Sequence, residues 1–119
     1  TYPMEDQHVL IPEEIQNISE ATTAYNQAIK QIAEANDLVF IDPTVLMALT
    51  QGVPFDGGVL SSTFVLGGAF SLDGAHMTPR GYAFVANKII EGINSKYNAT
   101  VPKVNIGNYN TITPSNNVQ

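Results

Sequence analysis

The chain has 119 residues, of which 44% are hydrophobic and 13% are charged, as expected of a single globular domain. Eleven acidic residues against five basic ones give a net charge of −6, which argues against binding to nucleic acid or to an anionic membrane surface. No cysteine is present, so disulfides and thiolate metal sites are excluded. No apolar run approaches the roughly 20 residues that span a bilayer.

An amphipathic helix is predicted from Pro12 to about Asn36. Pro12 suits the first helical position because its missing N–H costs nothing there. Two glutamates follow in the first turn, where negative charge complements the helix dipole. The pattern spans too few heptads for a coiled coil, so we expect this helix to pack on a sheet. Its apolar stripe recurs at steps of three and four residues: Ile15, Ile18, Thr22, Tyr25, Ile29 and Ile32.

A strand of a parallel sheet is predicted at residues 38–41. The sequence Leu-Val-Phe-Ile is an unbroken apolar run, which is typical of a strand buried on both faces. Asp42 is then expected to cap a short helix that has Pro43 at its first position. The order helix, strand, helix predicts the α/β class.

The segment from residue 51 to residue 71 is rich in glycine, which breaks any helix. Two short runs, residues 63–66 and 69–72, flank the pair Gly67-Gly68. That arrangement predicts a β-hairpin with a two-residue turn. The rest of this segment is expected to be a loop.

A second amphipathic helix is predicted to start near Pro79, with Thr78 as its N-cap. Its polar side is expected to carry Asn87, Lys88, Glu91, Asn94 and Lys96. Its apolar face is expected to consist of Tyr82, Val85, Ala86, Ile89, Ile90, Ile93 and Tyr97.

The domain organisation predicted from these elements is one domain over residues 1–102. Residues 103–119 are polar and rich in asparagine, and we expect an extended tail or surface strap there.

Asp73 and His76 carry the chemistry that the sequence predicts. Imidazole can take a proton from a serine hydroxyl near neutral pH, and a carboxylate on its other nitrogen fixes the tautomer and stabilises the imidazolium. A turn allows side chains three residues apart to meet. The alternative interpretation is structural: Asp73 begins a turn and His76 binds a backbone carbonyl.

The residues around this pair resemble a family motif. The string from Phe70 to Tyr82, with Asp73, His76, Thr78 and Pro79 in it, resembles the last motif block of the SGNH or GDSL-type ester hydrolases. The resemblance implies that Asp73 is the catalytic acid and His76 the catalytic base. It also implies an α/β fold that is the C-terminal portion of a flavodoxin-like doubly wound parallel sheet, here incomplete. The likeness to lipase-like members of the Bacteroidetes type suggests a location in the cell envelope or a secreted protein.

The nucleophile of such an enzyme is not evident. No serine follows a Gly-Asp pair, and no Gly-x-Asn-Asp string supplies oxyanion donors. We therefore expect the serine to lie in an N-terminal segment of the same protein, since the chain begins at Thr1 without a starting methionine. Ser61 or Ser62 could act instead, but neither is in a nucleophile elbow.

The expected function is that of part of a serine ester hydrolase, acting through an acyl-enzyme on a small carboxylic ester, a lipid or an acetylated sugar. The alternative is a non-catalytic binding or oligomerising module that forms a homo-oligomer through an open sheet edge. No cofactor is predicted. No metal is predicted either, because the two histidines show no metal-ligand spacing. His8 is expected to be a solvated loop residue.

Overall fold

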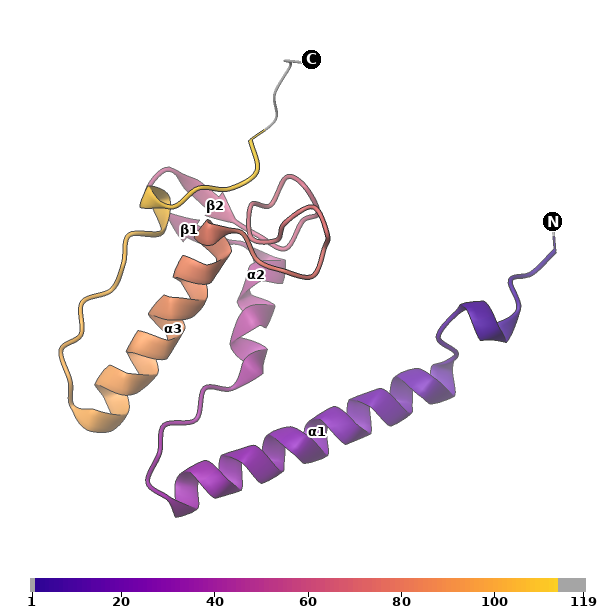
Figure 1. Cartoon of the computed structure of the whole chain (residues 1–119), viewed down its shortest axis with the longest axis horizontal. Helices are drawn as coiled ribbons and strands as arrows, with labels where there is room; N and C mark the ends of the chain where they lie inside the picture. The colour runs from indigo at the N-terminus through magenta and orange to yellow at the C-terminus, as the bar shows by residue number, and fades with distance from the viewer. Residues whose placement is uncertain (1, 114–119) are drawn as a thin grey trace. The chain divides into compact units, whose positions relative to one another are not determined.

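The computed structural model describes residues 2–113 (Figure 1). Its contacts divide the chain into two compact units, residues 1–40 and 41–119. The elements are η1 (Asp6–His8), α1 (Pro12–Ala35), η2 (Pro43–Met47), α2 (Ala48–Gln51), β1 (Val53–Phe55), β2 (Gly58–Leu60), α3 (Pro79–Tyr97) and η3 (Ile106–Asn108). None of the helices among these residues is long and apolar enough to cross a membrane.

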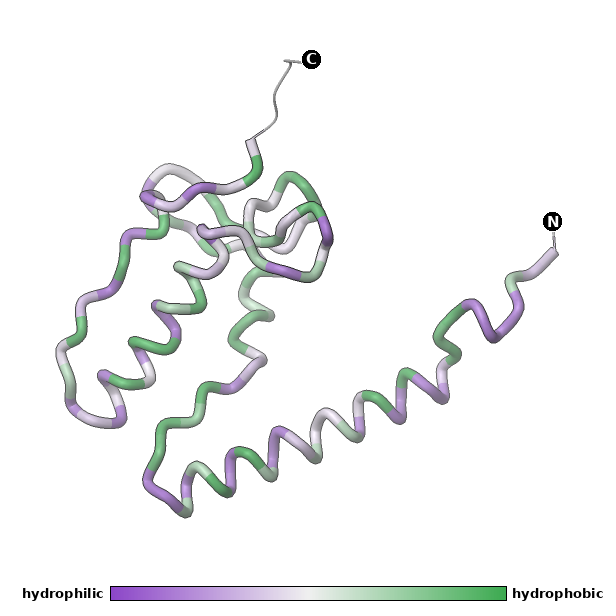
Figure 2. The backbone as a smooth tube through the Cα atoms, in the orientation of Figure 1, coloured by the Kyte–Doolittle hydropathy of each residue, from purple (hydrophilic) through white to green (hydrophobic). Residues whose placement is uncertain are grey.

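The first unit is built around α1, and the predicted helix is confirmed. Pro12 opens it, and the Glu14 carboxylate accepts a hydrogen bond from the backbone N–H of Ile11 at 3.0 Å. Hydrophobic and hydrophilic positions alternate along the helix in Figure 2. The isoleucines and Tyr25 of the apolar stripe are nevertheless 54–69% exposed. Within the first unit the described residues form no strand on which this helix could pack, so the expectation that it packs on a sheet stays a prediction.

The predicted fold class is also wrong. The described residues form three α-helices and one two-stranded antiparallel sheet, and not part of a doubly wound parallel sheet. Residues 38–41, the predicted parallel strand, belong to no strand. The physical reason is that a parallel strand needs hydrogen-bonded neighbours, and the two strands of the described residues, β1 and β2, pair with each other in an antiparallel hairpin.

The β-hairpin lies earlier in the chain than predicted. Strands β1 and β2 pair in the register Val53 with Leu60 and Phe55 with Gly58, which leaves Asp56-Gly57 as the turn. Gly57 has a φ of +109°, a conformation that glycine adopts without steric cost. Asp-Gly is a strong signal for such a turn, and the sequence-based prediction placed the turn at Gly67-Gly68 instead.

The core of the second unit is small and is formed by elements close in sequence. Leu49 from α2, Leu60 from β2, Ala69 from the following loop and Phe84 from α3 form one buried cluster. The Asp42 carboxylate accepts a hydrogen bond from Thr44 N at 2.8 Å, so the predicted cap of the short helix after it is confirmed. Helix α3 thus packs on the hairpin and on the loop that carries the candidate site.

Helix α3 begins at Pro79 as predicted, with the Thr78 hydroxyl accepting from the N–H of Gly81 at 3.1 Å. The face that it buries differs from the prediction. Asn87, expected on the polar outer side, is buried, whereas three residues of the predicted apolar face are exposed: Tyr82, Ile89 and Tyr97.

The cause of this difference is residues 101–111, which we call the C-terminal strap. The strap runs back alongside α3 (Figure 1). The Asn87 carboxamide donates to Val104 O at 2.9 Å and accepts from Val104 N at 2.8 Å. Asn94 makes the same pair of bonds to Val101, both at 2.9 Å. Seven helical residues rise about 10.5 Å and three extended residues span about 10 Å. The spacing of the two asparagines along the helix therefore matches the spacing of Val101 and Val104 along the strap.

The tail predicted over residues 103–119 falls partly on this strap, and residues 114–119 lie outside the described part of the chain.

Candidate acid–histidine site

The site is a turn that joins the core to the start of α3. An antiparallel bridge pairs Phe70 with Met77 at its base. Within it, Ser71 N donates to His76 O at 2.8 Å, and Gly74 N donates to Ser71 O at 3.0 Å. Gly74 has a φ of +70°, which a glycine adopts without strain. These bonds close the chain around Asp73 and His76.

The two side chains meet. Asp73 Oδ2 lies 2.7 Å from His76 Nδ1. The other carboxylate oxygen, Oδ1, accepts three hydrogen bonds: from Ser71 Oγ at 2.5 Å, from His76 N at 2.9 Å and from Ala75 N at 3.0 Å. One oxygen is therefore held by the turn and the other is left for the imidazole.

These donors hold the Asp73 carboxyl in its ionised form. The Ser71 hydroxyl contributes most, followed by the His76 ring and the N–H groups of Ala75 and His76, and together they keep the pKa of Asp73 well below its ordinary value of 3.8. The carboxylate is thus charged throughout the neutral range. Because the side chains of Asp73 and His76 are 50% and 78% exposed, their ion pair adds little to stability. The turn, rather than the pair, determines the geometry.

The second imidazole nitrogen, Nε2 of His76, accepts and donates no hydrogen bond within residues 2–113. When Nδ1 donates its proton to Asp73, Nε2 carries the free lone pair. An ionised carboxylate on one nitrogen and an open lone pair on the other is the arrangement that a general base requires.

Thr78 and its neighbours fix this turn to the helix. The Thr78 hydroxyl donates to Gly68 O at 2.6 Å, and Thr78 N donates to Ala69 O at 3.0 Å. A Cβ at Gly81 would lie 2.2 Å from Ala69 O, so only glycine lets the helix approach the loop this closely. The turn that carries His76, the candidate base, is therefore held against the buried start of α3, which is the kind of support that a catalytic group needs.

The C-terminal strap braces the same corner. The Thr111 hydroxyl donates to Gly68 O at 2.7 Å, beside the Thr78 hydroxyl. Arg80 donates from its backbone N to Asn110 O and from Nε to Tyr109 O, both at 3.0 Å. Residues that are distant in sequence thus support the start of α3.

The other residues that the sequence singled out lie elsewhere. The hydroxyl of Ser61 donates to Thr63 Oγ1 at 3.1 Å, and no hydrogen bond joins Ser61 or Ser62 to the His76 ring in the described part of the chain. His8 is exposed in η1 of the first unit. No group of three or more histidine, aspartate or glutamate residues in the described range could hold a metal ion.

Sequence reasoning missed two contributors. Ser71 stands two residues before Asp73, a spacing at which a hydroxyl can reach the carboxylate, and this was the available signal. No sequence pattern points to Thr111, because its contact with Gly68 depends on the path of the strap.

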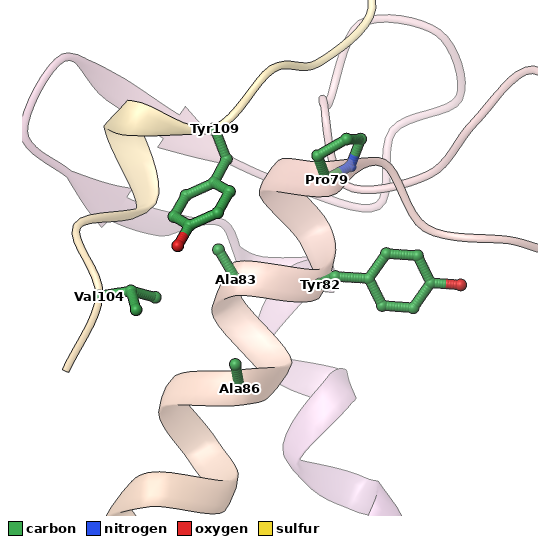
Figure 3. Close-up of a pocket in the computed structure, with 6 residues that line it drawn as sticks. All are labelled: Pro79, Tyr82, Ala83, Ala86, Val104 and Tyr109. Carbon is green, nitrogen blue, oxygen red and sulfur yellow. The ribbon is translucent and has the colours of Figure 1, made fainter. Parts of the chain in front are cut away.

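An apolar groove lies beside this corner, with a volume of about 400 Å³ (Figure 3). Pro79 is three residues after His76, so their Cα atoms are at most about 11 Å apart. The groove is formed by the first half of α3 and the strap, and its lining residues are Pro79, Tyr82, Ala83, Ala86, Val104 and Tyr109.

Comparison of the chain with protein-family models, with curated proteins and with solved structures found no match. A function is therefore inferred from the geometry of the Asp73–His76 turn and from the motif around it.

Proposed function

We propose that this chain supplies the general acid–base pair of a serine ester hydrolase. The observation that carries the proposal is the 2.7 Å contact between Asp73 Oδ2 and His76 Nδ1 on an exposed imidazole. The resemblance of residues 70–82 to the closing motif of the SGNH hydrolases supports the same assignment.

The chemistry follows from these two residues. His76 Nε2 takes the proton from a serine hydroxyl as its oxygen attacks the ester carbonyl, and Asp73 stabilises the imidazolium that forms. His76 then gives the proton to the departing alcohol, which leaves an acyl-enzyme. Water attacks the acyl-enzyme by the same proton transfers in reverse order, releasing the acid and the free serine.

The nucleophile and the oxyanion donors come, in this proposal, from a serine-bearing segment outside residues 1–119. No serine hydroxyl in the described range hydrogen-bonds the His76 ring, and Ser71 already donates its hydroxyl to Asp73. Tyr82, Ile89 and Tyr97 give α3 an exposed apolar face that such a segment could cover.

The substrate class proposed is a carboxylic ester, with a lipid ester and an acetylated sugar as the two candidates. The apolar lining of the groove beside Pro79 favours an ester with an apolar acyl or alkyl group. Matched p-nitrophenyl butyrate and acetylated xylose substrates would separate these two cases.

The test joins this chain to the segment encoded immediately before Thr1 and measures hydrolysis of p-nitrophenyl esters. We expect activity that falls at least about 1000-fold in His76→Ala and is unchanged in His8→Ala, the matched control in the first unit. Full activity in His76→Ala would refute the assignment, as would a joined protein that folds but hydrolyses no ester.

A fluorophosphonate probe tests the remaining source of the nucleophile. It should leave the 119-residue chain unlabelled and label the joined protein at a serine outside residues 1–119. Labelling of Ser61 or Ser62 in the 119-residue chain would show that the nucleophile belongs to this chain.

A second candidate function, a non-catalytic binding or oligomerising module, is favoured by one observation. The apolar stripe of α1 is exposed along its whole length, and exposed apolar faces of this kind mark interaction surfaces. Equilibrium sedimentation should then detect an oligomer that Ile18→Glu dissociates, with Gln27→Glu as the control on the polar side. A monomer at all concentrations would exclude self-association through this helix.

A further inference from the structure

We infer that Ser71 is a positioning residue, whose hydroxyl turns the Asp73 carboxylate so that Oδ2 faces the His76 ring. This inference rests on the proposed function, because it assigns a role within the same acid–base pair. It adds a residue that neither the sequence motif nor the mechanism above uses.

The hydrogen bonds of Ser71 link it to both members of the pair. Its Oγ donates to Asp73 Oδ1 at 2.5 Å, and its backbone N donates to His76 O at 2.8 Å. No other residue in the described part of the chain is bonded both to the Asp73 side chain and to the His76 main chain. Ser71 therefore sets the position of the acid relative to the base.

The hydroxyl contributes what the backbone donors cannot. The N–H groups of Ala75 and His76 belong to the turn that Asp73 begins, so they move with it. Ser71 precedes these residues, on the arm of the turn that is next to the Phe70–Met77 bridge. Its bond to Oδ1 ties the carboxylate to that arm. A carboxylate can otherwise rotate about its terminal torsion, where preferences are broad.

The same bond explains why Ser71 is not the nucleophile. A nucleophilic serine donates its hydroxyl to the imidazole, whereas Ser71 donates to the acid. The oxygen left unoccupied by the turn, Oδ2, is the one 2.7 Å from the ring.

The test uses the whole 119-residue chain labelled with ¹⁵N and ¹³C. Long-range ¹H–¹⁵N correlation reports which nitrogen of His76 carries the proton, and the ¹³C shift of the Asp73 carboxyl reports its titration. In the wild type we expect the Nδ1–H form to dominate over the Nε2–H form of the neutral imidazole. Ser71→Ala should lower the ratio of Nδ1–H to Nε2–H forms and strengthen proton binding by Asp73 about tenfold.

The matched variants separate positioning from folding. Ser71→Thr keeps the hydroxyl and should restore the wild-type values, Ser71→Cys keeps the size with a weaker donor and should be intermediate, and Ser95→Ala on α3 should change neither. The Gly81 amide shift reports whether the Thr78 cap is intact. If the Gly81 amide shift of Ser71→Ala differs from that of the wild type, the cap is disrupted in this variant. Ser71→Cys is then the variant that tests whether the hydroxyl positions Asp73. Wild-type tautomer ratios and Asp73 titration in the folded Ser71→Ala or Ser71→Cys variant would overturn the inference.

An activity measurement on the joined protein separates the two proposals. We expect Ser71→Ala to lower kcat about tenfold or more with little change in KM, and Ser71→Thr to restore it. An inactive joined protein with the tautomer change intact would reject the ester hydrolase and keep the role of Ser71. An active joined protein in which Ser71→Ala leaves kcat unchanged would keep the ester hydrolase and reject the role of Ser71.

Discussion

Helices α1 and α3 show how differently two amphipathic helices of one chain can be used. Both begin with proline at the first position, and both carry an apolar stripe. The stripe of α1 is exposed over its whole length, whereas α3 buries Phe84 and Asn87 against the core and the strap. The comparison teaches that a stripe predicts a helix well and its covering partner poorly.

The difference lies in what each helix packs against. Helix α3 packs against the hairpin, the loop before Pro79 and the C-terminal strap, all of the second unit. Helix α1 is followed by residues 38–41, whose apolar side chains predicted a parallel strand. The described residues form no parallel sheet. The candidate site is built at the start of α3, whereas the stripe of α1 is exposed in the described part of the chain.

The largest expected contrast between the two helices is at their aromatic residues. Phe84 is 2% exposed in the core, so Phe84→Ala should lower the free energy of unfolding by about 3–5 kcal/mol. Tyr25 on α1 is 69% exposed, and Tyr25→Ala should change it by less than about 0.5 kcal/mol. Urea unfolding followed by circular dichroism measures both. Equal losses would show that α1 is covered in solution.

The next effect concerns the contact between α3 and the candidate site. Gly81→Ala gains helix propensity of about 1 kcal/mol, but its Cβ would meet the carbonyl oxygen of Ala69 at 2.2 Å. Because that neighbour is backbone, we expect a net loss of about 1–3 kcal/mol and displacement of the turn from α3.

Gly92→Ala in the same helix is the control for this change, and it should stabilise by up to about 1 kcal/mol. Thermal unfolding of both variants gives the sign. Stabilisation by Gly81→Ala would mean that the loop does not approach the helix this closely.

The sequence predicted local features well and long-range pairings poorly. Proline at the helix starts and the caps Asp42 and Thr78 were predicted correctly, because each depends on neighbouring residues. The contact between Asp73 and His76 is also local. The prediction of a parallel sheet was wrong because such a sheet depends on further strands, and the described residues do not supply them.

The face of α3 could not be predicted for a related reason. Asn87 is polar, and a hydropathy pattern places it outside. Its burial follows from two hydrogen bonds to a backbone segment that returns from the C-terminal side. No periodicity in the helix encodes where that segment runs.

The strap itself is tested by Asn87→Ala, whose effect should be smaller again. Loss of the carboxamide leaves the N–H and C=O of Val104 without their partners, at a cost of about 1–2 kcal/mol. Hydrogen exchange at the Val104 amide should become faster while the amides of α1 keep their rates. Asn94→Ala is the comparison at the more exposed end of the strap, and it should loosen the strap less than Asn87→Ala does. Unchanged exchange at Val104 in Asn87→Ala would show that the strap is held by other contacts.

The smallest expected difference is electrostatic and distinguishes the two helices by pH. On α3, Glu91 accepts from Lys103 of the strap at 2.8 Å and from Lys88 at 2.9 Å, and these bonds, that of Lys103 first, lower the pKa of Glu91 below its ordinary value of 4.5. A lowered pKa means that the folded state binds the proton less well than the unfolded state. The stabilisation is therefore present above pH 4.5 and is lost as the pH falls through the lowered value.

Glu91→Gln should remove this dependence, at a cost below about 1 kcal/mol at pH 6 because the pairs are partly exposed, and salt should weaken the effect in the wild type. On α1, Glu34 is paired with Lys30 at 3.9 Å, with both side chains more than half exposed, so Glu34→Gln should leave unfolding unchanged at both pH values. The measurement is the difference in melting temperature between pH 6 and pH 3 for the three proteins. A wild type that loses no more stability than Glu91→Gln between these pH values would show that Lys103 does not hold the strap to α3 through this carboxylate.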